Sequence, residues 1–166
     1  LSFSLYGAGE SLLPDSGLYT YEASELKKYF HGTSSHNTVT VDNLDQAPGN
    51  VSIGKIIEGN GYVSQSGEHE LYKGVTQKRT ISLIGKRYAL IVDDLDSDKD
   101  HLYTQLFHTF SGGTVTNEGN TTKVSKGNAN VMSIYQLGEA KLNSDVITGQ
   151  EQPPKGICSN EYEKII

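Results

Sequence analysis

The chain has 166 residues and a formal net charge of −6, a length that suits one domain with its own hydrophobic core. The negative charge argues against nucleic acid as a partner, since no Lys/Arg cluster would displace phosphate counterions. A single cysteine, Cys158, excludes an intrachain disulfide and a cysteine-rich zinc site. No run approaches the roughly 18 apolar residues of a membrane span, and no signal peptide is visible.

The composition predicts an all-β domain. Glycine is frequent, with 18 residues, and there are 10 tyrosines but no tryptophan. Thr, Val, Ile and Tyr favour strands over helices. The chain starts with Leu1 rather than Met, inside an apparent strand, which suggests a fragment of a longer protein.

The first forty residues contain the only convincing helix. Residues 1–6 alternate apolar and polar side chains, which is typical of a half-buried strand. A second short strand is expected over 11–14, followed by turn residues at 15–17. The segment 22–30 carries Glu early and Lys late, as the helix dipole favours, and Gly32 is expected to end it.

Short strands at nearly regular spacing follow, separated by clusters of Gly, Asn and Asp. This pattern indicates a large antiparallel β-sandwich, resembling a supersandwich, with residues 1–166 as a single domain. The tail from residue 151 shows no periodicity. The strands are expected over 36–43, 51–58, 61–70, 75–84, 87–95, 101–110, 121–126, 129–137 and 140–148.

Tyrosines and histidines gather around a Gly-Thr-Ser-Ser turn within residues 15–46, as in a surface that contacts a polar ligand. His36 and Asn37 open a strand after this turn. They would either tie the turn down or face a sugar or carboxylate. Tyr29 would either pack at the helix end or act in proton transfer, since the nearby Lys27 and Lys28 favour its phenolate.

The other histidines give a weak signal for a metal, because none has the spacing of a helical zinc motif. His69 lies between two glutamates and is typical of a solvated strand end, with a metal ligand as the alternative. His108 is expected in the core with a backbone partner. His101 follows a charged turn and is expected to be an exposed loop residue.

Two stretches resemble a known family in order and spacing. LSFSLYGAGESLLPDSGLYTY and KKYFHGTSSHNTVTVDNLDQ are similar to the C-terminal domain of the heparinase II/III-like polysaccharide lyases, which include some alginate lyases. Residues 67–95, 101–110 and 156–162 extend the resemblance. It implies a parent with an α-helical toroid, absent from this chain, before the β-sandwich. It also implies β-elimination at a uronic acid.

The resemblance also assigns residues. It makes Asp15 and His69 zinc ligands, with the third ligand and a catalytic histidine upstream of Leu1, and it makes Tyr29 a catalytic phenol. The fragment alone would then bind zinc weakly and lack activity. The family's arginine after Tyr-Phe is His31 here, which leaves the substrate open. The substrate contacts would come from Lys28, His31, His36 and Asn37.

The expected function is therefore the β-sandwich part of a bacterial lyase that cleaves heparin-like, heparan-like or alginate-like glycans. Its partners would be an acidic polysaccharide and its own toroid domain, in the periplasm or outside the cell. One alternative is a non-catalytic carbohydrate-binding or structural β-sandwich. A weaker alternative is a metal-dependent hydrolase, which would need more zinc ligands than the sequence offers.

Overall fold

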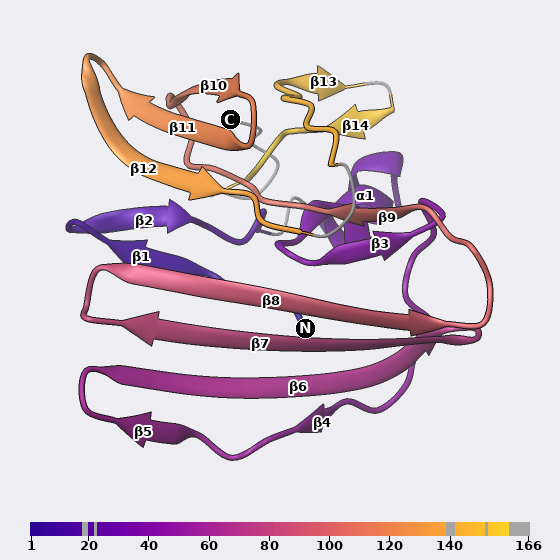
Figure 1. The fold of residues 1–166 in the computed structure, drawn as a ribbon. Helices are drawn as coiled ribbons and strands as arrows, with labels where there is room; N and C mark the ends of the chain where they lie inside the picture. The colour runs from indigo at the N-terminus through magenta and orange to yellow at the C-terminus, as the bar shows by residue number, and fades with distance from the viewer. Residues whose placement is uncertain (18–19, 22, 139–141, 152, 160–166) are drawn as a thin grey trace. The chain divides into compact units, whose positions relative to one another are not determined.

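The computed structural model describes residues 1–17, 20–21, 23–138, 142–151 and 153–159. Within these residues, short antiparallel strands dominate and one short α-helix occurs, which confirms the all-β prediction (Figure 1). The first elements are β1 (Leu5–Gly7), β2 (Glu10–Leu13), α1 (Glu25–His31), the 3-10 turn η1 (Thr33–Ser35) and β3 (Val39–Val41).

The remaining strands follow in chain order. They are β4 (Ser52–Ile53), β5 (Ile57–Gly59), β6 (Tyr62–Tyr72), β7 (Val75–Ile84), β8 (Tyr88–Ser97), β9 (Tyr103–Gln105), β10 (Thr114–Glu118), β11 (Thr121–Lys126), β12 (Ala129–Tyr135), β13 (Gln150–Glu151) and β14 (Pro154–Lys155). The largest sheet has the order β4-β6-β7-β8, with β5 also paired to β6. Smaller sheets are β1-β2, β3-β9, β10-β11-β12 and β13-β14.

The chain divides into two compact units. Unit 1 consists of Leu1 and Thr40–Thr104, and unit 2 consists of Ser2–Val39 and the residues from Gln105 onward. Unit 1 contains the five-stranded sheet, and unit 2 contains α1, the β1-β2 hairpin and the β10-β11-β12 sheet. The interpretation of residues 1–166 as one domain stays a prediction.

Unit 1 is built on two long hairpins, β6-β7 and β7-β8. The β7-β8 turn places Gly85 and Lys86 at φ of 60° and 57°, and the Arg87 amide donates to the Ile84 carbonyl at 3.1 Å. Two consecutive positive φ values are typical of the type I′ turn that matches strand twist. A buried cluster of Val41, Tyr72 and Val75 lies at the other end of these strands.

A buried ion pair crosses from β7 to β8. Arg79 donates from Nε and Nη2 to the two carboxylate oxygens of Asp93 at 2.7 and 2.8 Å, and from Nη1 to the Leu1 carbonyl at 2.9 Å. The two residues face each other in the strand register. A pair of this kind is stable only while both partners remain, because one buried charge left alone costs about 3–5 kcal/mol.

Unit 2 contains the helix, which is shorter at its start than expected. Ser24 caps it by accepting from the Lys27 amide at 3.1 Å, so the helix begins at Glu25 rather than at residue 22, which lies outside the described residues. Gly32 ends it, as expected. Tyr29 and Phe30 pack against Ile157 in a buried cluster.

Several expected strands differ from the observed ones. The segment 51–58 is split into β4 and β5 after Ile53, although the Gly54 amide still donates to the Ser66 carbonyl of β6. Residues 142–148 form no strand, and residues 140 and 141 lie outside the described part. The strands β10, β13 and β14 were not expected, because their polar, Thr-, Gln- and Pro-containing segments carry little alternation.

Candidate functional site

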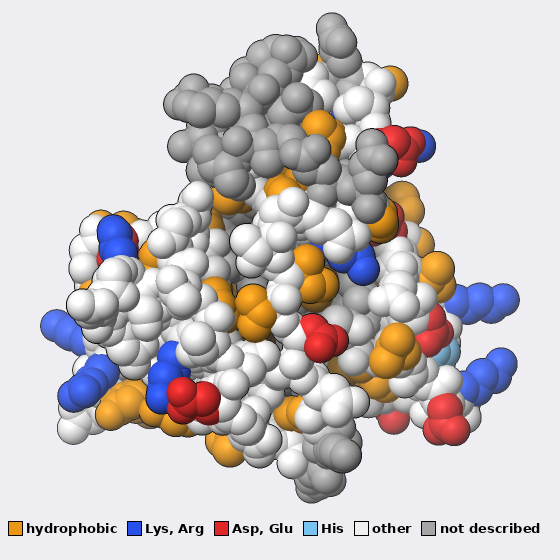
Figure 2. Space-filling model, turned by 90° about the horizontal axis from the view of Figure 1, so that it is seen from above, with side chains coloured by type: hydrophobic (Ala, Val, Ile, Leu, Met, Phe, Trp, Pro, Cys, Tyr) orange, Lys and Arg blue, Asp and Glu red, His pale blue; other side chains and the backbone are white. Residues whose placement is uncertain are grey.

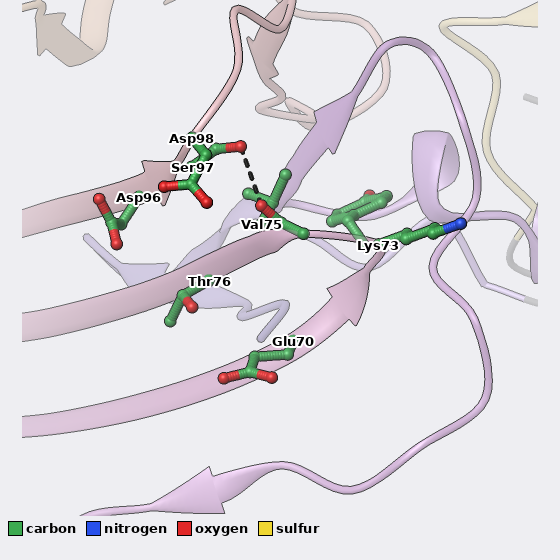
Figure 3. Close-up of a pocket in the computed structure, with 9 residues that line it drawn as sticks. Glu70, Lys73, Val75, Thr76, Asp96, Ser97 and Asp98 are labelled. Carbon is green, nitrogen blue, oxygen red and sulfur yellow. Dashed lines mark hydrogen bonds between the residues drawn. The ribbon is translucent and has the colours of Figure 1, made fainter.

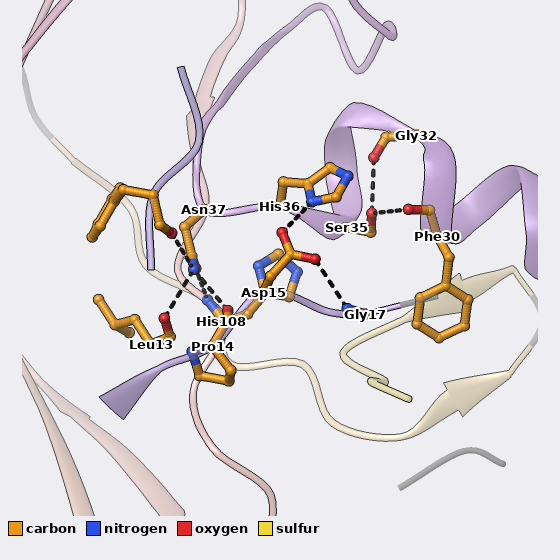
Figure 4. A network of polar contacts seen from close by, with 11 residues as sticks. Leu13, Pro14, Asp15, Gly17, Phe30, Gly32, Ser35, His36, Asn37 and His108 are labelled. Carbon is orange, nitrogen blue, oxygen red and sulfur yellow. Dashed lines mark hydrogen bonds and ion pairs between the residues drawn. The ribbon is translucent and has the colours of Figure 1, made fainter. Parts of the chain in front are cut away.

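In unit 2, Asp15 and His36 form a hydrogen-bonded pair that remains accessible to solvent. Nδ1 of His36 lies 2.7 Å from Oδ2 of Asp15, and Oδ1 of Asp15 accepts from the Gly17 amide at 3.0 Å (Figure 4). The exposed fractions of the two side chains are 26% for His36 and 49% for Asp15. The carboxylate thus orients the imidazole and leaves its other nitrogen, Nε2, outside the pair.

Asn37, next to His36, is a buried junction of four backbone groups. Its Nδ2 donates to the carbonyls of Phe3 at 2.9 Å and Pro14 at 2.8 Å, with Leu13 at 3.5 Å, and its Oδ1 accepts from the His108 amide at 2.6 Å. Only 1% of Asn37 is exposed. This geometry favours the structural alternative, in which Asn37 ties down the turn and positions His36.

The ring of His108 belongs to the same polar group in Figure 4. Its Nδ1 is buried and has no hydrogen-bond partner within the described part of the chain. Burial, with a smaller effect from His36, lowers the pKa of His108, while Asp15 and the Ser34 backbone act in the opposite direction. His108 is therefore a neutral imidazole with a backbone partner, as expected, but its bare Nδ1 was not foreseen from the sequence.

Tyr29 lies in a packing environment. It is 8% exposed, its ring meets Phe30 edge-on at 5.2 Å, and its hydroxyl lies 3.4 Å from the Ile157 carbonyl. Burial raises the pKa of Tyr29, although backbone hydrogen bonds to Ile157 and Gly156 oppose that effect. The expectation that Lys27 and Lys28 favour the phenolate is therefore not met. A role of Tyr29 in proton transfer stays a prediction.

The two cationic candidates lie at the surface of α1. Lys28 pairs with Glu25 on the exposed side of the helix, and His31 is exposed in its last turn. Both can reach an anionic ligand without a change in the fold. Their assignment to substrate binding stays a prediction.

His69, the second metal candidate, lies in unit 1 on β6 and is buried, with 4% exposed, rather than solvated as its glutamate neighbours suggested. Its Nε2 lies 3.1 Å from Nε2 of Gln46, and its Nδ1 lies 3.3 Å from the Leu71 amide. In both contacts as placed the imidazole nitrogen would accept, which a neutral imidazole does at only one nitrogen, so both hydrogen bonds form together only when the Gln46 amide turns its oxygen toward Nε2. Burial is the main reason why the pKa of His69 is lowered.

The polar surroundings of His69 extend to Gln77, which faces it across the β6-β7 pair. Both amide atoms of Gln77 are buried, and neither has a hydrogen-bond partner among the residues that the structure describes. Asp15 belongs to unit 2 and His69 to unit 1. No group of three or more His, Cys, Asp or Glu side chains suited to a metal ion occurs in the part of the chain that the structure describes.

A shallow hollow lies at the end of β6, β7 and β8 in unit 1 (Figure 3). Its polar lining is mostly acidic, with Glu70, Asp96 and Asp98 beside a single cation, Lys73. None of the site residues expected from the sequence lines it. An acidic hollow would repel a uronic-acid polymer, which makes it a poor candidate for the substrate site.

His101 lies in a loop, as expected, but only 16% of its side chain is exposed rather than most of it, and it is paired with Asp42. Its Nδ1 lies 2.7 Å from Oδ2 of Asp42, and Oδ1 of Asp42 accepts from the Leu102 amide at 2.9 Å. The hydrogen bond from His101, followed by that from Leu102, lowers the pKa of Asp42. Unit 1 thus holds an Asp-His pair of the same geometry as Asp15 and His36.

Comparison with known proteins identifies the family. The heparinase II/III-like C-terminal family matches residues 1–160. The chain belongs to this family. A heparin-sulfate lyase of Bacteroides stercoris is 34% identical over 101 residues, which cover 57% of this chain and 15% of that protein. A heparin-sulfate lyase of Pedobacter heparinus is 26% identical over 96 residues, covering 55% and 15%.

Solved structures share the fold of this heparinase II/III-like domain. A mutant of the heparan sulfate lyase HepC from Pedobacter heparinus has a TM-score of 0.84 at 20% identity and covers 99% of this chain and 26% of its own. A heparinase III has a TM-score of 0.79 at 22% identity, covering 99% and 25%. The matched part of the chain spans about 15% of the length of the two heparin-sulfate lyases named above. None of the described helices could cross a membrane.

Proposed function

We propose that this heparinase II/III-like domain is the β-sandwich part of a lyase that cleaves heparin-like or heparan-like polysaccharides by β-elimination. The observation that carries the proposal is the family match over residues 1–160, together with relatives that are heparin-sulfate lyases. Acidic polysaccharide would be the substrate, and an upstream helical toroid would complete the cleft. We propose a periplasmic or secreted location for the longer protein, because its substrate would be a polysaccharide.

The pair of Asp15 and His36 suits the proton transfer that such a reaction needs. β-Elimination removes the proton at C5 of the uronate, forms the C4–C5 double bond and releases the 4-O-glycosidic oxygen. A neutral His36 that donates from Nδ1 to Asp15 presents an unprotonated Nε2, as a general base requires. We propose that His36 receives a proton in this way and that Lys28 and His31 attract the substrate's anionic groups.

A panel of polysaccharides tests the proposed reaction. The longer protein that contains this domain is mixed with heparan sulfate, alginate or an uncharged glucan, and the ultraviolet absorbance of unsaturated uronate is followed. We expect absorbance to rise with heparan sulfate and to stay flat with the glucan. The 166-residue chain alone is expected to give no product. No product from any uronate polymer would favour a non-catalytic carbohydrate-binding role.

A structural zinc ion is part of the same proposal. An accessible carboxylate at Asp15 and a neutral imidazole at His69 are groups that zinc accepts, so the donor chemistry fits. Asp15 and His69 are the two candidate ligands that this chain would supply, and a third ligand would come from outside this chain.

Metal analysis of the longer protein checks the zinc proposal. We expect His69→Ala to lower the bound zinc from about one equivalent to well below half, because three-ligand sites rarely survive the loss of one ligand. His101→Ala serves as the control, since His101 pairs with Asp42 and is no candidate ligand. Zinc content that is equal in both variants would rule out His69 as a ligand.

A further inference from the structure

We propose that one end of the five-stranded sheet in unit 1 is a second binding surface for an anionic polysaccharide, centred on Tyr62 and Tyr88. This surface belongs to unit 1, whereas Asp15 and His36 belong to unit 2. It relies on the proposed function only for the class of sugar. The turns β5-β6 and β7-β8 lie at the same end of the sheet (Figure 1).

The strand register places the two tyrosines on one face. Tyr62 on β6 pairs with Ile84 on β7, and Ile84 pairs with Tyr88 on β8. Residues directly opposite in neighbouring strands point to the same side of a sheet. Because adjacent strands lie about 4.8 Å apart, the backbones at Tyr62 and Tyr88 are about 10 Å apart, with Ile84 between them.

All three side chains are unusually exposed for their type. The exposed fractions are 45% for Tyr62, 40% for Ile84 and 63% for Tyr88. The patch continues along the same face, since Ile57, Leu90 and Val92 are also exposed, at 60%, 45% and 47%. Contiguous exposed apolar and aromatic side chains mark binding surfaces more often than isolated ones do.

The backbone beside Tyr62 leaves room for its ring. Tyr62 pairs with Gly59 on β5, and a Cβ atom at Gly59 would lie 2.1 Å from the Tyr62 ring. The ring thus leans across β5 at a position where any other residue would displace it. The absence of a side chain at Gly59 thus lets the Tyr62 ring lie over β5 at this end of the sheet.

Cations stand at the same end of the sheet. The Arg87 guanidinium lies 5.7 Å from the centre of the Tyr88 ring, a cation–π arrangement. Lys86 adopts a left-handed conformation at φ 57°, where Gly or Asn is favoured. A non-glycine residue here costs about 1 kcal/mol or more, and such strain points to a use for the side chain.

The charge along this face indicates an anionic sugar as the occupant. The carboxylates of this face, at Glu68, Asp94 and Asp96, lie toward the opposite end of the strands. Tyr62 and Tyr88 offer flat surfaces for the C–H faces of sugar rings, and Lys86 and Arg87 offer donors for carboxylate or sulfate groups. The spacing of the two tyrosine rings, with Lys86 and Arg87 at the same end of the sheet, therefore fits a chain of acidic sugars.

Binding of a heparin-derived oligosaccharide to the 166-residue chain tests the proposal, with dextran of similar length as the neutral probe. Calorimetric titration is expected to show that Tyr62→Ala and Tyr88→Ala each weaken heparin binding by at least about fivefold. Tyr135→Ala is the matched control, because Tyr135 is 70% exposed on β12 and belongs to unit 2. This control is expected to bind like the unchanged chain.

Three results would contradict the proposal that this surface binds an anionic polysaccharide. The first is equal weakening by all three substitutions, and the second is no detectable heparin binding by the unchanged chain. The third is concentration-dependent self-association in sedimentation that Tyr88→Ala abolishes, since the patch would then join copies of the chain. None of these results affects the lyase proposal, which is tested separately by the appearance of unsaturated product. Conversely, an inactive parent would leave the binding measurement fully interpretable.

Discussion

His36→Gln is expected to lower the kcat of the proposed lyase reaction, measured on the longer protein that contains this domain, about 10²–10⁴-fold, the range that general acid–base groups contribute. Glutamine keeps a polar side chain of similar reach but cannot exchange a proton near neutral pH. KM for heparan sulfate is expected to change little, because the lost interaction belongs to the transition state. Asp15→Asn is expected to disturb both the orientation of the ring and the proposed zinc site, so the test of proton transfer rests on His36→Gln.

The second Asp-His pair provides the control for His36. His101→Gln removes an imidazole bonded to Asp42 at 2.7 Å, the same distance as between His36 and Asp15. It is expected to leave kcat within about twofold, because His101 belongs to unit 1 and is no part of the proposed catalytic pair. Comparable losses of kcat in both variants would mean that His36 acts only through stability. A normal kcat in His36→Gln would remove His36 from the reaction.

Asn37→Asp is expected to lower the free energy of unfolding by at least about 3 kcal/mol, a large fraction of the stability of a domain. The carboxylate keeps the size of the amide but loses its two donor hydrogens. It would then face the carbonyls of Phe3 and Pro14 without a hydrogen between the oxygens. Each buried polar group left without a partner costs about 1–3 kcal/mol.

Urea denaturation of the 166-residue chain measures the effect at Asn37. Asn130→Asp is the matched control, because Asn130 is exposed on β12 and bonds only to the Ser133 hydroxyl at 3.0 Å. The control is expected to change the free energy of unfolding by less than about 0.5 kcal/mol. If Asn37→Asp is as stable as the control, the amide of Asn37 faces solvent or ligand instead, as the substrate-binding interpretation requires.

The sequence predicted the long hairpins well, because their signals are local. The expected strand 75–84 coincides with β7, and 121–126 coincides with β11. Alternating side chains and glycine turns determine such hairpins with little help from distant residues. The expected strand 101–110 was predicted less well, because the observed strand β9 covers only Tyr103–Gln105. The length of β9 depends on its pairing with β3, which lies far away in the sequence.

The candidate site was predictable only in part. The proximity of Asp15 and His36 depends on the fold, so a sequence separation of 21 residues gave no sign of their hydrogen bond. The same holds for Asn37 and His108, which are 71 residues apart. The buried pair of Arg79 and Asp93 could have been found, since opposite charges in consecutive expected strands align once the turn at Gly85 fixes the register.

The masses of the products formed from heparan sulfate test the central claim most directly. Elimination leaves an unsaturated uronate at the new non-reducing end, so each product pair has the mass of the starting chain with no water added. Hydrolysis adds one water to each broken bond. We predict unsaturated products from the longer protein that contains this domain. Saturated products would contradict the account and would favour a metal-dependent hydrolase instead.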